Sequence, residues 1–148
     1  MDWDRYFMDI AIAVSKNSKC LSRQIGVVLV RNKSIIATGY NGPPRGVHHC
    51  EGTICPRKAA GYGSGEGLHL CRAAHAERNA ISNAALNGVS TNNCILYMNC
   101  VLPCKDCAAM IINSGICMVV VDTPGVYDAI GKEMLDEVGI PYDVINLN

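Results

Sequence analysis

The chain has 148 residues, of which 49% are hydrophobic and 18% are charged, a balance typical of a globular protein with a substantial core. Its 13 basic and 13 acidic side chains cancel, which argues against a positive field that attracts nucleic acid over long distances. No apolar run reaches the roughly 18 residues that a membrane-spanning helix needs. The length predicts a single domain over residues 1–148.

Cysteine is unusually frequent, with nine residues in the chain. The sequence begins Met-Asp-Trp-Asp and shows no apolar run of the signal-peptide type, which predicts a cytoplasmic protein. In a reducing compartment, metal binding explains many cysteines better than disulfide bonds do.

The first part of the chain predicts one helix and one hairpin. Apolar residues recur at helical spacing over residues 2–16, which favours an amphipathic helix. Two strand-like runs follow at 25–30 and 34–40, and Asn32-Lys33 lies between them as the turn, although Asn-Gly is the preferred sequence there. An Asn-Gly-Pro-Pro sequence ends the second strand.

The remainder of the chain predicts alternating strands and helices after an irregular segment at residues 48–70. A loop of that length in a small domain is usually functional or tied by a metal ion. Periodicity and helix-stop signals then predict helix 73–86, strand 94–99, helix 104–113, strand 116–121, helix 126–138 and strand 142–145. A hairpin followed by such alternation predicts an α/β fold of three layers, α/β/α, with a mixed five-stranded sheet.

Two short motifs contain the ligands for a metal ion. His-Ala-Glu begins at His75, and Pro-Cys-Lys-Asp-Cys ends at Cys107. Zinc prefers nitrogen and sulfur, and a catalytic site leaves one position open for water, so His75, Cys104 and Cys107 predict a catalytic zinc site. Glu77 remains available to move protons, because zinc lowers the pKa of its bound water from about 16 towards about 7. The same pattern marks the zinc-dependent nucleobase deaminases.

Both motifs are expected at the starts of helices. Pro103 suits the first turn of a helix, in which Cys104 and Cys107 lie one turn apart and the helix dipole favours thiolates. His75 and Glu77 are expected in the first turn of the preceding helix. A redox pair or half of a structural zinc site is the alternative for a lone C-x-x-C, but the redox alternative leaves His75 and Glu77 without a role.

Across nearly its whole length the chain resembles the cytidine deaminase superfamily, and within it the deoxycytidylate (dCMP) deaminases. Besides the two motifs, the resemblance is carried by Cys-Leu-Ser-Arg-Gln-Ile-Gly from Cys20, Thr-Gly-Tyr-Asn-Gly from Thr38, and Asn-Ala-Ile from Asn79. It implies a cytidine-deaminase-like fold and a hydrolase that converts dCMP and water to dUMP and ammonia, which feeds thymidylate synthesis. It also implies that Glu77 takes a proton as water attacks C4, and then delivers protons to N3 and the departing amine.

The resemblance further implies the contacts of the substrate. Asn41 and the backbone near Ala76 are expected to contact the pyrimidine and the sugar, although Asn41 is also an ordinary turn residue. Arg23, Arg45, Lys105 and backbone amides are candidates for the phosphate. Arg23 lies in a resembling segment, and arginine suits bidentate phosphate binding. A solvated surface side chain is the alternative for each arginine.

A second, structural zinc site is a further expectation, because some dCMP deaminases carry one in the irregular segment. Zinc can hold a loop where no core can. Cys20, Cys50 and Cys71 are the expected ligands. The fourth ligand is one of the other soft side chains nearby: Cys55, His48, His49 or His69. Ordinary buried or free cysteine is the alternative, and it is the expectation for Cys94 and Cys117.

Regulation and assembly are implied by the resemblance alone. Many dCMP deaminases are hexamers that dCTP with Mg2+ activates and dTTP inhibits, which places Gly42 and the Asn79 region near the effector. The expected partners are therefore small nucleotides and further copies of the chain, with neither nucleic acid nor a membrane.

Three other functions compete with this hypothesis. A deaminase of another base, such as tRNA adenosine, is disfavoured by the neutral net charge and the flanking segments. A catalytically silent zinc-binding protein has no use for Glu77. A zinc-ribbon-like nucleic-acid module lacks a basic patch, and here the ligand halves lie 29 residues apart (75 to 104) without a second C-x-x-C.

Overall fold

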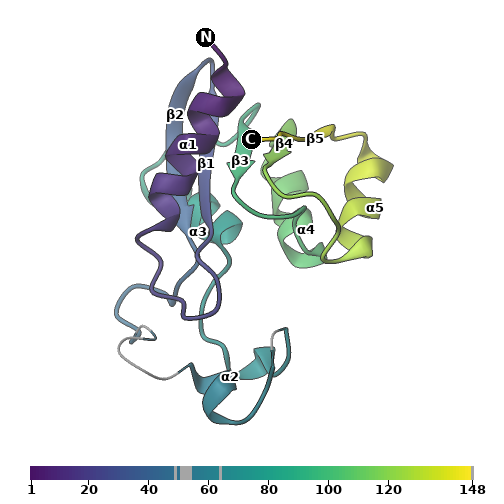
Figure 1. Cartoon of the computed structure of the whole chain (residues 1–148). Coiled ribbons are helices and arrows are strands. Elements are labelled where there is room, and N and C mark those ends of the chain that lie inside the picture. Colours follow the sequence, from purple (N-terminus) through teal and green to yellow (C-terminus); the bar gives the residue numbers. More distant parts are fainter. Residues whose placement is uncertain (49, 51–54, 64, 148) are drawn as a thin grey trace.

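A mixed five-stranded sheet lies at the centre of the protein (Figure 1). The computed structural model describes residues 1–48, 50, 55–63 and 65–147. The strands follow the order β2-β1-β3-β4-β5 across the sheet. Their bounds are β1 Gly26–Arg31, β2 Ser34–Tyr40, β3 Ile95–Met98, β4 Met118–Val121 and β5 Tyr142–Val144.

The predicted hairpin is confirmed. Strands β1 and β2 pair in antiparallel register up to Arg31 and Ser34, so that Asn32 and Lys33 form a two-residue loop. Both loop residues have positive φ, 52° and 60°, as a type I′ turn requires. The turn therefore forms without the glycine that usually occupies its second position.

The other strand pairs make the sheet mixed, as predicted. β1 pairs antiparallel with β3, whereas β3 with β4 and β4 with β5 are parallel. The parallel pairs are joined through helices α4 (Lys105–Asn113) and α5 (Ala129–Val138). Parallel neighbours need such crossovers, because no tight turn can connect them.

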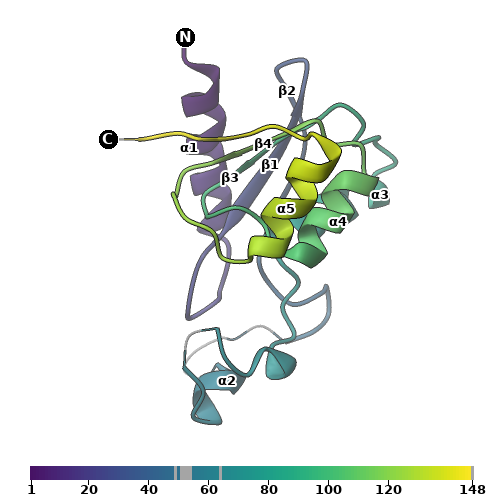
Figure 2. The ribbon, with the colours of Figure 1, turned by 90° about the vertical axis from the view of Figure 1, so that its right-hand side faces the viewer.

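Helices cover both faces of the sheet and form three layers (Figure 2). Side chains alternate along β1, so that Val28 faces helix α1 (Trp3–Ser15) and Val27 faces the other side. Helix α1 buries Phe7 and Met8 against the first face. Helices α3 (Ala76–Leu86), α4 and α5 cover the second face. This arrangement confirms the predicted α/β/α fold.

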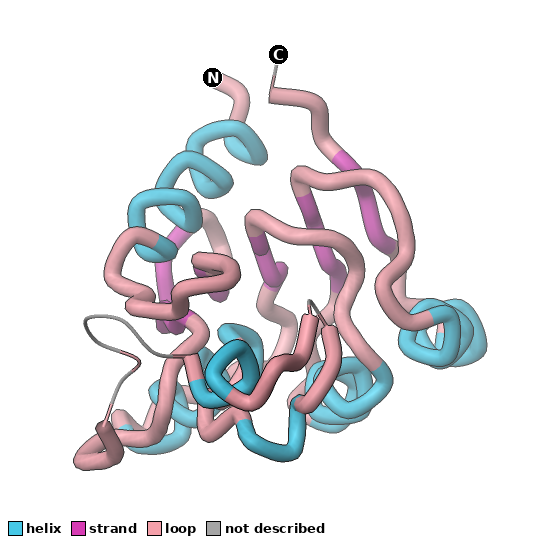
Figure 3. Tube along the Cα trace, turned by 60° about the horizontal axis from the view of Figure 1, so that its bottom comes forward, coloured by secondary structure: helices cyan, strands magenta, loops and turns pink. Residues whose placement is uncertain are grey.

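The C-terminal segment of the described chain ends beside helix α1, on the same side of the molecule as the N-terminus (Figure 3). The Arg5 guanidinium donates a hydrogen bond to the Leu147 carbonyl at 3.0 Å. None of the helices that the structure describes is long and apolar enough to cross a membrane.

Several predicted boundaries were wrong. The segment predicted as irregular contains a short helix, α2 (Pro56–Ala59), which lies below the sheet in Figure 1, and the 3₁₀ turn η1 (Leu68–Leu70). Helices predicted from 73, 104 and 126 begin at 76, 105 and 129. Hydrophobic periodicity locates a helix but not its cap, because the capping residue has extended rather than helical backbone angles.

Candidate active site

The two sequence motifs meet at the starts of α3 and α4. His75 is the N-cap of α3, Cys104 is the N-cap of α4, and Cys107 lies in the first turn of α4. The His75 Nδ1 atom lies 3.6 Å from the Cys104 Sγ atom and 3.3 Å from the Cys107 Sγ atom. The fold therefore brings together three donor atoms that are predicted metal ligands.

Their spacing fits a zinc ion. Tetrahedral zinc with a Zn–N bond of about 2.0 Å and Zn–S bonds of about 2.3 Å separates nitrogen and sulfur by roughly 3.5 Å. The two observed N···S distances, 3.3 and 3.6 Å, lie on either side of this value. A three-ligand set of one nitrogen and two sulfurs leaves the fourth position for water.

The local backbone leaves these donors available. His75 and Cys104 both have extended backbone angles, and neither side chain forms a capping hydrogen bond with its own helix. Their imidazole and thiol can therefore turn toward the metal. The prediction that Pro103 lies in the first turn was wrong: it precedes the N-cap, because Cys104 itself occupies the extended capping position.

The Cys104 and Cys107 thiols influence each other's pKa. A hydrogen bond from the Cys107 thiol, assisted by His75, lowers the pKa of Cys104 to about 3. The pKa of the Cys107 thiol is raised, chiefly because it is the donor in that bond and also because it is buried. The two pKa values therefore shift in opposite directions, and the Cys104 thiol is the more acidic of the two.

Glu77 is buried beside this centre, with 4% of its surface exposed. It lies in the first turn of α3, two residues after His75. Burial raises the pKa of its carboxyl group above the ordinary value. A carboxyl group with a raised pKa can both accept and return a proton near neutral pH, which is what a general acid and base needs.

Arg78 is a site residue that the sequence reasoning missed. Its guanidinium Nε donates a hydrogen bond to the Cys107 Sγ atom at 3.4 Å. The pKa of Arg78 is raised, foremost by this bond. Its positive charge is favourable beside the sulfurs of Cys107 and Cys104. The signal in the sequence was its position directly after Glu77, in the helix start that carries the His-Ala-Glu motif.

The expected substrate residues lie around the end of β2. The Asn41 side chain accepts a hydrogen bond from the Ile25 N–H at 2.9 Å and donates one to the Arg23 carbonyl at 2.8 Å. Asn41 therefore fixes the loop that carries Arg23. Ala76 is buried, with 1% of its surface exposed, between His75 and Glu77.

Of the three cationic candidates for phosphate binding, Arg23 lies close enough to Cys100 for its charge to act on that thiol. Burial raises the pKa of the Cys100 thiol, the charge of Arg23 lowers it, and the charge of Glu77 raises it. Arg23 and Glu77 therefore both lie within electrostatic reach of Cys100. Arg45 instead donates to the Asn83 side-chain Oδ1 atom at 2.7 Å, and Lys105 pairs with Asp106 at 3.2 Å.

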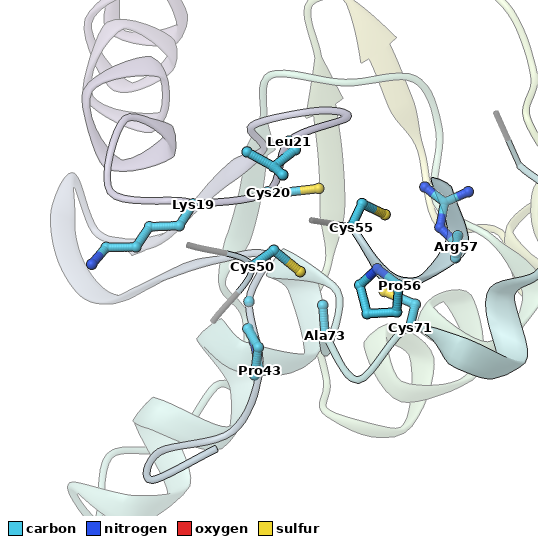
Figure 4. Close-up of a pocket in the computed structure, with 11 residues that line it drawn as sticks. Lys19, Cys20, Leu21, Pro43, Cys50, Cys55, Pro56, Arg57, Cys71 and Ala73 are labelled. Atoms are coloured by element: carbon cyan, nitrogen blue, oxygen red, sulfur yellow. The ribbon is translucent and has the colours of Figure 1, made fainter. Parts of the chain in front are cut away.

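Four cysteines line a small cavity of about 30 Å³ (Figure 4). They are the three predicted ligands Cys20, Cys50 and Cys71, together with Cys55. Burial and then the three neighbouring thiols raise the pKa of Cys50, whereas the backbone N–H of Lys58 lowers that of Cys55.

The four cysteines are less closely spaced than the first donor set. Within the described part of the chain, the donor atoms that all lie within 4.8 Å of one another are those of His75, Cys104 and Cys107. Cys55 lines the cavity, whereas His69 packs edge-on against the Tyr62 ring. His49, another candidate for the fourth ligand, lies outside the described residues.

A larger cavity, of about 360 Å³, lies between the end of β2 and helix α3. Both residues expected near an effector, Gly42 and Asn79, line it. The Asn79 side chain donates to the Tyr40 carbonyl at 2.8 Å, which ties α3 to the end of β2. Its remaining lining residues are Tyr40, Pro43, Pro44, Arg45, Ala74, Ser82 and Asn83.

An α/β/α fold that presents histidine, two cysteines and a buried glutamate at two helix starts is the arrangement of the zinc-dependent nucleobase deaminases. The family model described as "cytidine and deoxycytidylate deaminase zinc-binding region" matches residues 1–123, and the chain belongs to this family.

Relatives support the same placement. The deoxycytidylate deaminase of Schizosaccharomyces pombe is 41% identical over 138 residues, which cover 93% of this chain and 42% of that protein. The deoxycytidylate deaminase of Mycobacterium phage D29 is 37% identical over 127 residues, which cover 80% of this chain and 93% of that protein. The chain thus spans about two fifths of the length of the yeast relative and most of the phage relative.

Solved structures confirm the fold. The dCMP deaminase of cyanophage S-TIM5, in complex with dCMP and dUMP, has a TM-score of 0.77 and 27% sequence identity. The match covers 95% of this chain and 94% of that chain. The predicted cytidine-deaminase-like fold is therefore correct over nearly the whole chain.

Proposed function

We propose that the protein is a zinc-dependent enzyme that hydrolyses dCMP to dUMP and ammonia. We further propose that it acts in the cytoplasm as one domain over residues 1–148. The observation that carries the proposal is the convergence of His75, Cys104 and Cys107 beside the buried carboxyl group of Glu77. The choice of dCMP is supported by relatives named deoxycytidylate deaminase that match most of this chain.

Zinc at His75, Cys104 and Cys107 would supply water activated for attack at neutral pH. Glu77 takes up a proton at its carboxylate as the water oxygen adds to C4 of the cytosine ring. It passes this proton to N3, then takes up the second proton from the oxygen now bonded to C4 and passes it to the amino group, which leaves as ammonia while the oxygen remains on C4 as the carbonyl of dUMP. The buried position of Glu77 suits it to both directions of proton transfer, because burial raises its pKa.

The substrate contacts follow the same proposal. Asn41 and the backbone at Ala76 hold the base and the sugar, and Arg23 binds the phosphate. Support for Arg23 comes from the Asn41 hydrogen bond that fixes its loop, and from its nearness to Cys100, on whose thiol its charge acts. Arginine offers two parallel N–H donors to a phosphate, which a lysine cannot match.

A second zinc ion is proposed as a structural ligand of the long loop. Cys20, Cys50 and Cys71 provide three sulfurs, and Cys55 is the preferred fourth ligand because it lines the same cavity. Four sulfurs form a closed tetrahedral site with no place for water, which is typical of structural zinc. The positions of Arg57 and Lys58 beside Cys55 favour its thiolate form, and the Lys58 N–H contributes most.

Allosteric control is proposed at the larger cavity. Its volume of about 360 Å³ falls within the range of small-ligand sites, and Gly42, Asn79 and Arg45 line it. We propose that dCTP with Mg2+ activates and dTTP inhibits a homohexamer through this cavity. A substrate-saturation curve that dCTP and dTTP leave unchanged over a wide concentration range would contradict this control.

One assay tests the catalytic proposal. Purified protein of measured zinc content is given dCMP, deoxycytidine, cytidine, dCTP or an adenosine-containing RNA, and ammonia release is followed with and without dCTP and Mg2+. Selective turnover of dCMP is the expected result. Turnover of another substrate would contradict the assignment of dCMP, and no turnover by zinc-loaded protein would contradict the assignment of an enzyme.

A further inference from the structure

Helix α5 contacts the loop that carries Cys104 through one carboxylate. Asp128 is the N-cap of α5, and its Oδ1 atom accepts from the Ile130 N–H at 3.0 Å. Its Oδ2 atom accepts from the Lys105 N–H at 2.9 Å. Lys105 is the first residue of α4 and directly follows Cys104. A single carboxylate therefore connects the N-termini of two helices.

The second contact is between backbones. Gly131 of α5 is buried against residues 103–105, and a Cβ atom there would lie 2.3 Å from the Pro103 carbonyl oxygen. The same Cβ atom would lie 2.9 Å from the Cys104 carbonyl carbon. Distances this short exclude any side chain unless the two segments move apart. An isolated parallel bridge between Leu102 and Val126 joins the same two segments.

Cys104 is both the N-cap of α4 and a proposed zinc ligand. An N-cap side chain usually accepts a hydrogen bond from its own helix, but the Cys104 side chain forms no such bond. A sulfur that ligates zinc is not available as a cap. Asp128, on a neighbouring helix, instead accepts from the Lys105 N–H, so that one N–H of the first turn of α4 is satisfied while the Cys104 Sγ atom lies 3.6 Å from the His75 Nδ1 atom.

We propose that Asp128 and Gly131 are positioning residues that hold the backbone of Cys104, and hence its sulfur, in the geometry that zinc requires. The inference rests on the proposed zinc site. It adds two supporting residues that lie outside both sequence motifs. Both residues meet the segment that carries Cys104 at its backbone, at the Lys105 N–H and the Pro103 carbonyl oxygen. Their effect reaches the metal through the backbone at residues 103–105.

The test is a zinc dissociation constant measured by competition with a chromophoric chelator. We expect Gly131→Ala and Asp128→Ser to weaken zinc binding at the first site by about 10- to 100-fold, the usual effect of losing support behind a metal ligand. The Co2+-loaded variants should also show altered thiolate-to-cobalt absorption, which reports on sulfur geometry independently of activity. Serine retains a cap for α5, so Asp128→Ser keeps the test open if Gly131→Ala does not fold.

Two matched controls separate positioning from general stability. Gly26 makes a similar close approach on the opposite face of the sheet, where a Cβ atom would lie 2.1 Å from the Ala11 carbonyl oxygen. Gly26→Ala should lower the Tm without changing the zinc dissociation constant of the folded protein. Asp136→Asn removes a carboxylate from α5 that binds Lys132 instead of α4, and it should leave zinc binding unchanged.

The outcomes are distinct. Unchanged zinc affinity and unchanged cobalt spectra in both Gly131→Ala and Asp128→Ser would overturn the inference. A loss of zinc affinity in Gly26→Ala as large as in those two variants would also overturn it. If wild-type protein and His75→Ala bound the same amount of zinc, the proposed catalytic zinc site would be absent. The proposed function and the positioning role would then both be wrong. Weakened zinc binding in Gly131→Ala and Asp128→Ser, with unchanged binding in the two controls, supports the inference.

Discussion

The two cysteine-containing regions of the molecule differ in how their donor atoms are held. His75, Cys104 and Cys107 lie at the starts of α3 and α4, which pack against the sheet, and all their donor atoms lie within 4.8 Å of one another. The four cysteines around the small cavity come from loops and from the beginning of the short helix α2, and their sulfurs are more widely spaced.

The difference has a physical reason. Packed helices hold side chains in position before a metal ion binds. Core packing therefore already orders the ligands, and metal binding does not have to order them. Loop ligands lack that support and depend on the metal ion to draw them together. We therefore expect the first region to control chemistry and the second to control stability.

The largest expected effect separates chemistry from metal binding within the first region. Glutamine has the shape of Glu77 but cannot carry its proton, so Glu77→Gln should lower kcat for dCMP by about 10²- to 10⁴-fold. Zinc content should not change, because Glu77 is not one of the three proposed ligands. Steady-state kinetics on protein of measured zinc content checks both points, and a kcat close to wild type would show that Glu77 does not carry the proton.

The next effect belongs to the four-cysteine region. Cys71→Ser should reduce bound zinc from two ions to one per chain, because oxygen is a poorer zinc ligand than thiolate. At a free zinc concentration 100 times the Kd, loss of that ion should cost about 2.7 kcal/mol of unfolding free energy. Metal analysis and thermal unfolding measure these changes. Cys117→Ser, at an exposed cysteine outside both regions, is the control.

A wild-type stoichiometry of one zinc ion per fully loaded chain would reject the second site. In that case the two regions would differ in whether they bind a metal ion at all, because only His75, Cys104 and Cys107 would bind zinc.

A smaller effect is expected at Arg78. Loss of its hydrogen bond to Cys107 leaves a more electron-rich thiolate and a less acidic zinc-bound water. Arg78→Gln should therefore lower kcat/KM by about 10-fold, within the range for such supporting residues. It should also move the acid limb of the pH–rate profile to higher pH. Arg78→Lys keeps the charge and is the matched control; identical profiles for all three proteins would contradict the role.

The smallest effect tests whether stability alone influences either region. The Tyr97 hydroxyl donates to the Asp4 carboxylate at 2.7 Å on the α1 face of the sheet. Loss of this bond in Tyr97→Phe should cost about 1 kcal/mol, with no change in zinc content. Denaturant unfolding and metal analysis measure the two quantities, and altered zinc content would show that the regions respond to any loss of stability.

The difference in unfolding free energy between wild type and Tyr97→Phe should not depend on pH near neutrality. Burial, assisted by Asp4, raises the pKa of Tyr97 above the ordinary value of 10.0. Because the folded-state pKa is the higher one, the stabilisation is fully present below about pH 10 and is lost only as the pH rises through the folded-state value. The difference between wild type and Tyr97→Phe should therefore be constant from about pH 6 to about pH 9.

Most elements of the fold could be predicted from the sequence, because alternation and helical periodicity are local patterns. The hairpin around Asn32 and Lys33 was found correctly although the turn lacks glycine. The starts of α3, α4 and α5 were misplaced by one to three residues (73 to 76, 104 to 105 and 126 to 129), and α2 was missed. A four-residue helix such as α2 is too short to produce a periodic pattern.

The sequence by itself determined the chemistry of the first site, because the residue types and their spacing in two short motifs specify one nitrogen, two sulfurs and one carboxylate. Only the tertiary structure decided that Arg78 bonds to Cys107, that Asp128 caps two helices, and that Cys55 lines the cavity with the predicted cysteines. These are contacts between segments far apart in the chain or between particular side-chain directions. They depend on how the helices pack on the sheet, which no local pattern of residues encodes.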